Sequence, residues 1–287
     1  MKKILCALLI LLSSFLLLSS CASHKNEKEK GIKIAAPPFN GYICGFEDDT
    51  TFLQLPLFVA ITDNFTLSDI ENIALVGDSV SLPCSQYRLS DFYNSKLDAY
   101  KFATLSFHVH LKEIGQYSVN KIIISSPKKT EITLSLGTIN FDIRKNPVPD
   151  YQDKYLSMSQ FFVNQTFISP LRISYINNYD EPICIKRFTY PKPICRGVKI
   201  DKYLDFDLSS KESDCEILPN DEKTFVVNFD FLDDFNREKN FYYFLPFVIF
   251  EIGQTEYIMP AQTQATVIQA PFTAEIVKTF TTNFNES

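Results

Sequence analysis

Two histidines, His108 and His110, are the residues whose type and spacing most readily suggest chemistry. They stand two positions apart in TLSFHVHL (residues 104–111), where apolar and polar residues alternate. A strand with this alternation projects both imidazoles from one face, and two imidazoles on one face could bind one metal ion. The sequence offers no identifiable third ligand. We therefore expect two partly solvated histidines on an outer sheet face, with Phe107 and Val109 in a core, and we predict no metal or other cofactor.

Other signatures of catalysis are missing from the sequence. It contains no G-x-S-x-G, no S-x-x-K with its partner motifs and no phosphate-binding glycine loop. The acidic clusters at 47–49 and 230–234 do not match the pattern of a calcium loop. A carboxylate pair for glycoside cleavage is assembled in space and leaves no fixed spacing. We predict no catalytic residue, and we keep a lipid-anchored hydrolase with a spatially assembled site as the alternative.

Seven cysteines raise the question of disulfides. Beyond residue 21 five remain, an odd number that leaves at least one unpaired: Cys44, Cys84, Cys184, Cys195 and Cys215. Their spacing does not suggest zinc. The candidate bridges are Cys184–Cys195 and Cys44–Cys84, and a buried free thiol is an equally good interpretation of each cysteine. If residues 190–193 form the hairpin turn, the register places Cys195 opposite Phe188, which weakens the first pair.

Strand signals follow one another along most of the chain, because aromatic and β-branched residues dominate its apolar content. Strands are expected at 51–61, 70–76, 104–111, 119–125, 132–143, 155–163, 171–177, 183–190, 198–208, 224–231, 241–252 and 256–267. Gly137 should interrupt its strand as a bulge or turn. The aromatic run at 241–244 should pack in the core. The best candidate for a short helix is residues 90–102, with Ser90 as its cap.

Two prolines in Asn146-Pro147-Val148-Pro149-Asp150 indicate a boundary, because they stiffen the chain and do not suit a central strand. Short strands separated by turn signals are typical of antiparallel sandwiches. We therefore predict one β-sandwich domain at 35–146, a second at 150–275, and a C-terminal tail at 276–287.

The second part resembles a known fold. LRISYINNYDEPICIKRFTYP (171–191) and ILPNDEKTFVVNFDF (217–231) resemble small extracellular immunoglobulin-like domains, in which a strand ends in Asn, a polar turn follows and an apolar strand returns. The resemblance spans about residues 155–267. Trp is absent from the chain, so the buried Cys–Trp–Cys set of antibody domains is not available and only the architecture is implied. The expected fold class is all-β, with two consecutive antiparallel immunoglobulin-like sandwiches.

The N-terminal stretch LLLSSCASHKNEKEKG (16–31) changes abruptly from apolar to charged at Cys21. Lys2 and Lys3 precede an apolar run that is short for a membrane span but suits a secretory signal. Its end, Leu18-Ser19-Ser20-Cys21, resembles the lipobox of bacterial lipoprotein signals. That resemblance implies a signal peptide at 1–20 and lipidation of the Cys21 thiol, where two or more acyl chains anchor stably. The charged residues that follow cannot pack, so 21–34 should be a flexible tether.

Charge limits the choice of partners. The net charge of −6 and the lack of a basic stripe argue against nucleic acid. A transporter's substrate-binding component ranks last, because such proteins usually alternate helices with strands. The sequence thus predicts an extracytoplasmic lipoprotein on the cell membrane, a non-enzymatic binding or accessory protein of the cell envelope. Its partners would be membrane lipid, through Cys21, and either another envelope protein or a cell-surface polymer.

Overall fold

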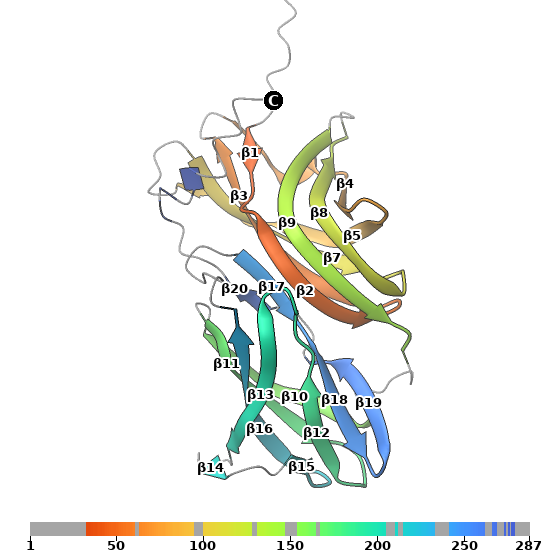
Figure 1. Ribbon diagram of the computed structural model, residues 1–287. Helices are drawn as coiled ribbons and strands as arrows, with labels where there is room; N and C mark the ends of the chain where they lie inside the picture. Colours follow the sequence, from red (N-terminus) through yellow and green to blue (C-terminus); the bar gives the residue numbers. More distant parts are fainter. Residues whose placement is uncertain are drawn as a thin grey trace, which may run out of the picture. The chain divides into compact units, whose positions relative to one another are not determined.

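The computed structural model describes residues 33–60, 63–94, 100–127, 131–146, 154–164, 167–204, 210–211, 215–232, 241–261, 266–268, 273, 275 and 277–278. Nearly all the regular structure in these segments is β-strand, joined by one short 3-10 turn at Leu67–Asp69. None of their helices has the length and apolarity needed to cross a membrane. The fold is therefore all-β, as the strand signals predict (Figure 1).

The first half of the chain forms one long sheet that folds over into two layers. Its order is β1 (Ile34–Ala35), β3 (Thr50–Ala60), β7 (Tyr100–His110), β5 (Ser81–Leu89), β4 (Asn72–Val76), β8 (Gly115–Ser125), β9 (Glu131–Arg144), β2 (Phe39–Phe46), β17 (Phe241–Leu245) and β20 (Thr266–Ile268), and β6 (Tyr93–Asn94) also pairs with β7. Strand β5 connects the two layers, because its residues 81–83 pair with β4 and its residues from Cys84 onward pair with β7. The β5–β7 ladder has a bulge between Ser85 and Arg88, and Gln86, with φ of 49°, lies in this bulge.

The second half forms a two-sheet sandwich. One sheet has the order β10 (Leu156–Asn164), β11 (Phe167–Asn177), β16 (Glu222–Phe231), β13 (Cys195–Leu204) and β14 (Ser210–Lys211); the other has β15 (Glu216–Ile217), β12 (Ile183–Phe188), β18 (Phe247–Ile252) and β19 (Thr255–Pro260). Ile173 and Phe225 from the first sheet share a buried core with Ile185 and Phe250 from the second. This division of antiparallel strands is that of a β-sandwich, and the predicted all-β class is confirmed.

A buried asparagine explains the strand–Asn–turn pattern in the sequence. Asn177 is fully buried, and its amide group donates to the carbonyl oxygens of Glu181 and Ile217, both at 2.9 Å. Its side-chain oxygen accepts from the Tyr179 N–H at 2.8 Å. One side chain thus ties the end of β11 to the following turn and to β15, and a buried polar group with all its hydrogen bonds made is stable there.

Strand β2 departs from the antiparallel expectation. It runs parallel to both of its neighbours, β9 and β17. Strand β17 belongs to the range predicted for the second domain, yet it lies in the sheet of the first half and continues through Pro246 into β18 of the second sandwich. Residues 34–287 form one compact unit. Residues 147–150 lie outside the described residues, and the domain division remains a prediction.

The glycine at 137 does interrupt its strand. The register jumps from Val119 opposite Ile139 to Lys121 opposite Ser135, so two residues of β8 span four of β9. A Cβ at Gly137 would lie 2.5 Å from the side-chain oxygen of Asn40, so the bulge needs a residue without one.

The described part of the expected helix at 90–102 is extended instead. The Ser90 N–H donates to the Thr104 carbonyl at 3.0 Å, and the Ser90 hydroxyl accepts from the Thr104 N–H at 2.8 Å. Ser90 therefore pairs across a ladder and caps no helix. Tyr93 and Phe102 face each other in the β6–β7 pair, where aromatic residues are more stable than in a short, weakly patterned helix. Residues 95–99 lie outside the described residues.

Candidate functional site

The histidine face has the register that the sequence predicts. Phe107 and Val109 are buried, whereas His108 and His110 are half-buried on the opposite face of β7. The His108 ring lies 5.3 Å from the ring of Phe52, and its Nδ1 atom is buried with no hydrogen-bond partner among the described residues. Within those residues, no three His, Cys, Asp or Glu side chains converge as metal ligands.

Strand β5 brings a serine to this face. Ser85 lies opposite His108 in the ladder, and its hydroxyl is 2.7 Å from His110 Nε2. A serine–histidine contact supplies two of the three groups of a nucleophilic triad, and the histidine still needs a third group to orient it. His110 has no carboxylate partner among the described residues. The arrangement is therefore a cross-strand hydrogen bond on a sheet face.

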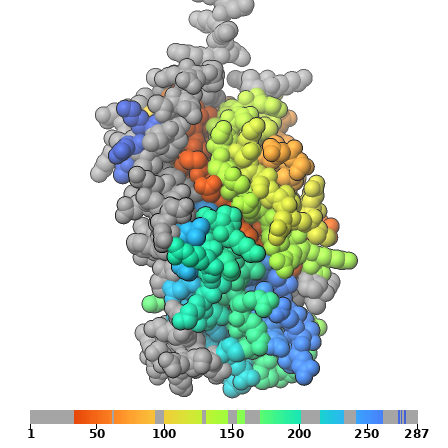
Figure 2. Space-filling model, viewed as in Figure 1, coloured from red at the N-terminus to blue at the C-terminus, as the bar shows by residue number. Residues whose placement is uncertain are grey.

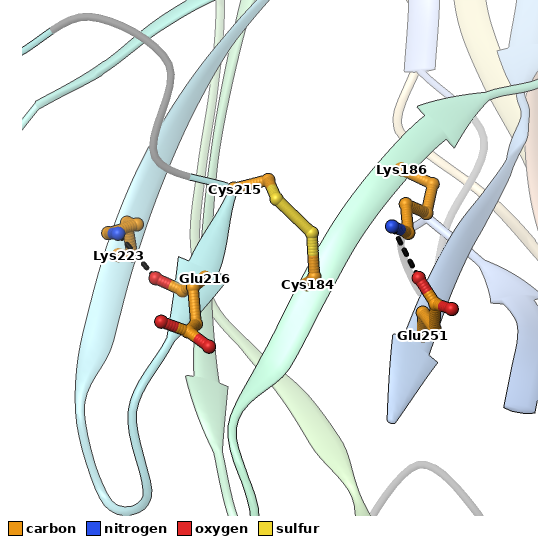
Figure 3. The surroundings of a disulfide bond; sticks show 6 residues. All are labelled: Cys184, Lys186, Cys215, Glu216, Lys223 and Glu251. Atoms are coloured by element: carbon orange, nitrogen blue, oxygen red, sulfur yellow. Dashed lines mark hydrogen bonds and ion pairs between the residues drawn. A yellow bond between two sulfur atoms is a disulfide. The ribbon is translucent and has the colours of Figure 1, made fainter. Parts of the chain in front are cut away.

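The structure corrects both predicted disulfides. Cys184 pairs with Cys215, with their Cα atoms 4.9 Å apart (Figure 3). Strand β12 lies beside β15, and Cys184 faces Glu216 in that ladder, so Cys215 is the neighbouring thiol. Cys195 lies on β13 in the other sheet. Cys44 and Cys84 lie on β2 and β5, which are separated by three strands, too far for a bridge.

The remaining described thiols are buried and unreactive by environment. Cys44 and Cys84 are free and buried, and Cys195 is buried as well. Burial raises the pKa of Cys44 to about 12, and it raises the pKa of Cys84 to about 12 as well. Since the thiolate is the nucleophile, neither thiol is suited to catalysis near neutral pH. Cys21, the predicted lipidation site, lies outside the described residues.

Polar and aromatic groups join the two halves where β2 ends. Arg144 pairs with Asp142 at 3.0 Å, and its guanidinium lies 5.0 Å from the ring of Phe247. The Phe247 N–H donates to the Thr189 hydroxyl at 2.9 Å, and the Thr189 N–H donates back to the Phe247 carbonyl. The Phe46 ring lies 5.5 Å from that of Phe247. These contacts fix a junction, and none of these groups is arranged for a reaction.

The described residues of the two acidic clusters make local contacts. The Asp49 carboxylate accepts a hydrogen bond from the Phe46 N–H at 3.2 Å within the β2–β3 turn, and Asp48 has φ of 68° there. Asp230 lies 3.8 Å from Arg196. Asp233 and Asp234 lie outside the described residues. The aromatic run is core, as expected: Tyr242, Tyr243 and Phe244 are all buried.

Three tyrosines from distant parts of the sequence meet at one margin of the second sandwich. We call Tyr155, Tyr179, Tyr257 and the adjoining Lys154 the tyrosine edge. The Tyr155 ring lies 5.0 Å from that of Tyr179 and 5.1 Å from that of Tyr257. Tyr257 also stacks on the buried Phe250 at 5.5 Å. Tyr155 is buried, whereas the other two rings are half-buried and reach solvent.

An exposed lysine adjoins the tyrosine edge. The ammonium group of Lys154 lies 4.9 Å from the Tyr155 ring, and hydrogen bonding to Tyr155 raises the pKa of Lys154. The Tyr155 carbonyl accepts from the Asn178 N–H at 2.8 Å, which holds the ring beside the β11–β12 turn. Aromatic rings with polar hydroxyls can stack on a partner and hydrogen-bond to it. The arrangement is suited to binding, and the sequence did not indicate it.

Comparison with known proteins adds no assignment. No family model matches the chain, and no curated protein matches it. A protein of unknown function from Porphyromonas gingivalis W83 is 12% identical, with 83% of this chain and 94% of that chain covered and a TM-score of 0.20. The D00-D0 domain of Intimin is 9% identical, with 82% and 99% covered and a TM-score of 0.20. No function follows from either likeness.

Proposed function

We propose that this protein is a lipid-anchored, extracytoplasmic binding or accessory protein of the bacterial cell envelope, and that it holds its partner at the tyrosine edge. The anchor rests on the lipobox-like residues that end at Cys21. The observation that carries the binding site is the pair of half-buried rings, Tyr179 and Tyr257, that meet on the buried ring of Tyr155.

The position of the tyrosine edge within the compact unit supports this role. The unit begins at Ile34, and Phe39 pairs with Phe241 at the start of β17. From there the chain runs through β17 and β18 to Gly253, twelve residues on, or about 40 Å at the rise of a strand. Tyr179 lies in the turn at that far end, since Gly253 lies close to Glu181. The tyrosine edge therefore lies at the opposite end of these strands from the pair formed by Phe39 and Phe241.

Cell fractionation tests the anchor. Cys21→Ala should stay unprocessed at this site or be released from the membrane, because the thiol that receives the lipid is gone. A Cys21→Ala protein that fractionates and migrates like the parent contradicts the lipoprotein proposal.

Photo-crosslinking of the full chain in its own cells tests the binding site. Tyr257 is replaced by p-benzoylphenylalanine, and the matched control places the same group at the exposed Lys121 on β8. We expect an adduct at 257 that is absent at 121: a discrete band for an envelope protein, or a polydisperse one for a polymer. Equal adducts at both positions, or none at either, would rule out the tyrosine edge as the binding site.

A further inference from the structure

Strand β19 is exceptional among the sheet edges in the described part of the chain. Other edge strands are short: β1, β14 and β15 have two residues each and β20 has three. The long edge β10 is broken by register shifts at 158–160 and 162–164. Shortness and bulges are two of the ways in which proteins prevent strand addition, and charged side chains and proline are others. Strand β19 has six residues that pair with β18 without any shift, and it lies at the margin of its sheet (Figure 1).

The ladder fixes which backbone groups of β19 face outward. The Ala261 N–H donates to the Pro246 carbonyl at 2.8 Å, so this pair is hydrogen-bonded. Antiparallel pairs alternate, and Ile258 opposite Ile249 is therefore a pair without ladder bonds. The N–H and C=O of Glu256 and Ile258 point away from β18, and Pro260, which lacks an N–H, follows in the same phase. A proline at a position whose backbone points away from β18 removes no hydrogen bond of the ladder, as expected at an open edge.

The surroundings of β19 define what could add to it. Tyr257 points toward the core side, where its ring meets that of Tyr155, the residue before β10. Glu256 lies on the other face, exposed and paired with Arg187 at 3.1 Å. At the turn end, Asp180 and Glu181 are exposed carboxylates without an ion pair among the described residues. In Figure 2 the blue atoms of the β18–β19 region lie at the surface at the lower right.

We propose that an extended, cationic segment of a partner protein adds to β19 as a fifth strand of the β15–β12–β18–β19 sheet. Its backbone would bond to the outward groups of Glu256 and Ile258, as in other cases of strand addition. Alternate side chains would pack on Tyr257, and a basic side chain would lie near the exposed carboxylates of Asp180 and Glu181 at the turn end. This inference deepens the proposed function and rests on it, since it names the partner's chemistry at the tyrosine edge.

A single proline distinguishes strand addition from other binding at the same place. Ile258→Pro removes one outward N–H and no bond to β18, and Pro260 shows that this phase tolerates proline. The matched control, Ile258→Ala, shortens the side chain and keeps the N–H. The probe is a library of random linear dodecapeptides on phage, selected against the full mature chain, from which the strongest peptide is synthesised.

We expect the selected peptide to alternate basic and apolar residues. Binding should weaken at least tenfold in Ile258→Pro and less than threefold in Ile258→Ala. Hydrogen exchange of the parent provides a second measurement that does not depend on the folding of the proline variant. The peptide should protect the amides of Glu256 and Ile258, which are otherwise among the fastest in β19.

Other results overturn the inference in distinguishable ways. Equal binding to Ile258→Pro and parent, without protection of those two amides, refutes strand addition. If Tyr257→Ala then abolishes binding, the proposed function stands without it; if binding also survives Tyr257→Ala, both proposals fail. A parent that dimerises while Ile258→Pro is monomeric identifies a second copy as the occupant and refutes the partner segment. Selection that yields no peptide above background refutes it as well.

Discussion

Removing the Cys184–Cys215 disulfide should destabilise the fold by an amount that its loop length determines. The two cysteines are 31 residues apart in sequence. Closing a loop of that length lowers the entropy of the unfolded chain by about 12 cal/mol/K, or about 3.7 kcal/mol at 25 °C. Both residues are half-buried, so little packing is lost with them. For a chain of this size the midpoint of thermal unfolding should fall by roughly 7–15 °C.

The assay compares the Cys184→Ala/Cys215→Ala double variant with the parent, both exported so that the bridge can form. Urea unfolding gives the free energy, and peptide mapping without reductant identifies the linked pair. The control is Cys195→Ala, which leaves the Cys184–Cys215 bridge in place because Cys195 lies on the other sheet. A double variant within about 1 kcal/mol of the parent refutes the loop-entropy reasoning. A linked peptide that joins Cys184 to Cys195 refutes the pairing.

The other predictions concern the histidine face, the buried thiols and the division of the chain. Replacing His108 and His110 with Gln should change the free energy of unfolding by less than about 0.5 kcal/mol, and the parent should purify without stoichiometric zinc; tight zinc that is lost together with folding would contradict this. Phe107→Ala, at a site 1% exposed, should cost about 3–5 kcal/mol, as melting curves would measure. The pKa of Cys44, raised to about 12, keeps the thiol protonated at pH 8. Native protein should therefore react with iodoacetamide far more slowly than unfolded protein, and equal rates would contradict the burial of Cys44. The fragment 35–146 lacks β17, which leaves β2 without one neighbour. The fragment should therefore lose the cooperative unfolding that the chain 31–287 retains. A cooperative transition in the isolated fragment would support two independent domains.

The local sequence pattern predicted strands whose apolar and polar residues alternate, and it did not predict strands without that alternation. The segment 104–111 fixes its own register, because only one face of β7 is apolar. Strand β2 escaped prediction because FNGYICGF is a central strand buried along most of its length, with two glycines and no clear alternation. Strand β5 escaped because Pro83 and the bulge at Gln86 interrupt it where it passes between layers.

Long-range pairing explains the remaining failures. The disulfide depends on β15 lying beside β12, a contact that no spacing between cysteines reveals. The tyrosine edge forms because β10, β11 and β19 meet at one margin of a sandwich. Its three tyrosines are therefore far apart in sequence, and no local pattern relates them. Residues that a single strand places together could be read from the sequence, whereas residues brought together by strand order could not.

The shared strand has a consequence for how a partner would be held. The run from β17 through Pro246 into β18 crosses the junction as nearly continuous chain, and the paired hydrogen bonds between Thr189 and Phe247 close it beside the cation of Arg144. Such a junction resists bending, so freedom at the membrane would come from the proposed tether at 21–34. A solvated tether of that length spans about 20 Å on average. It would hold the chain close to the membrane, so the effective concentration of the tyrosine edge toward a partner fixed in the same envelope would be high.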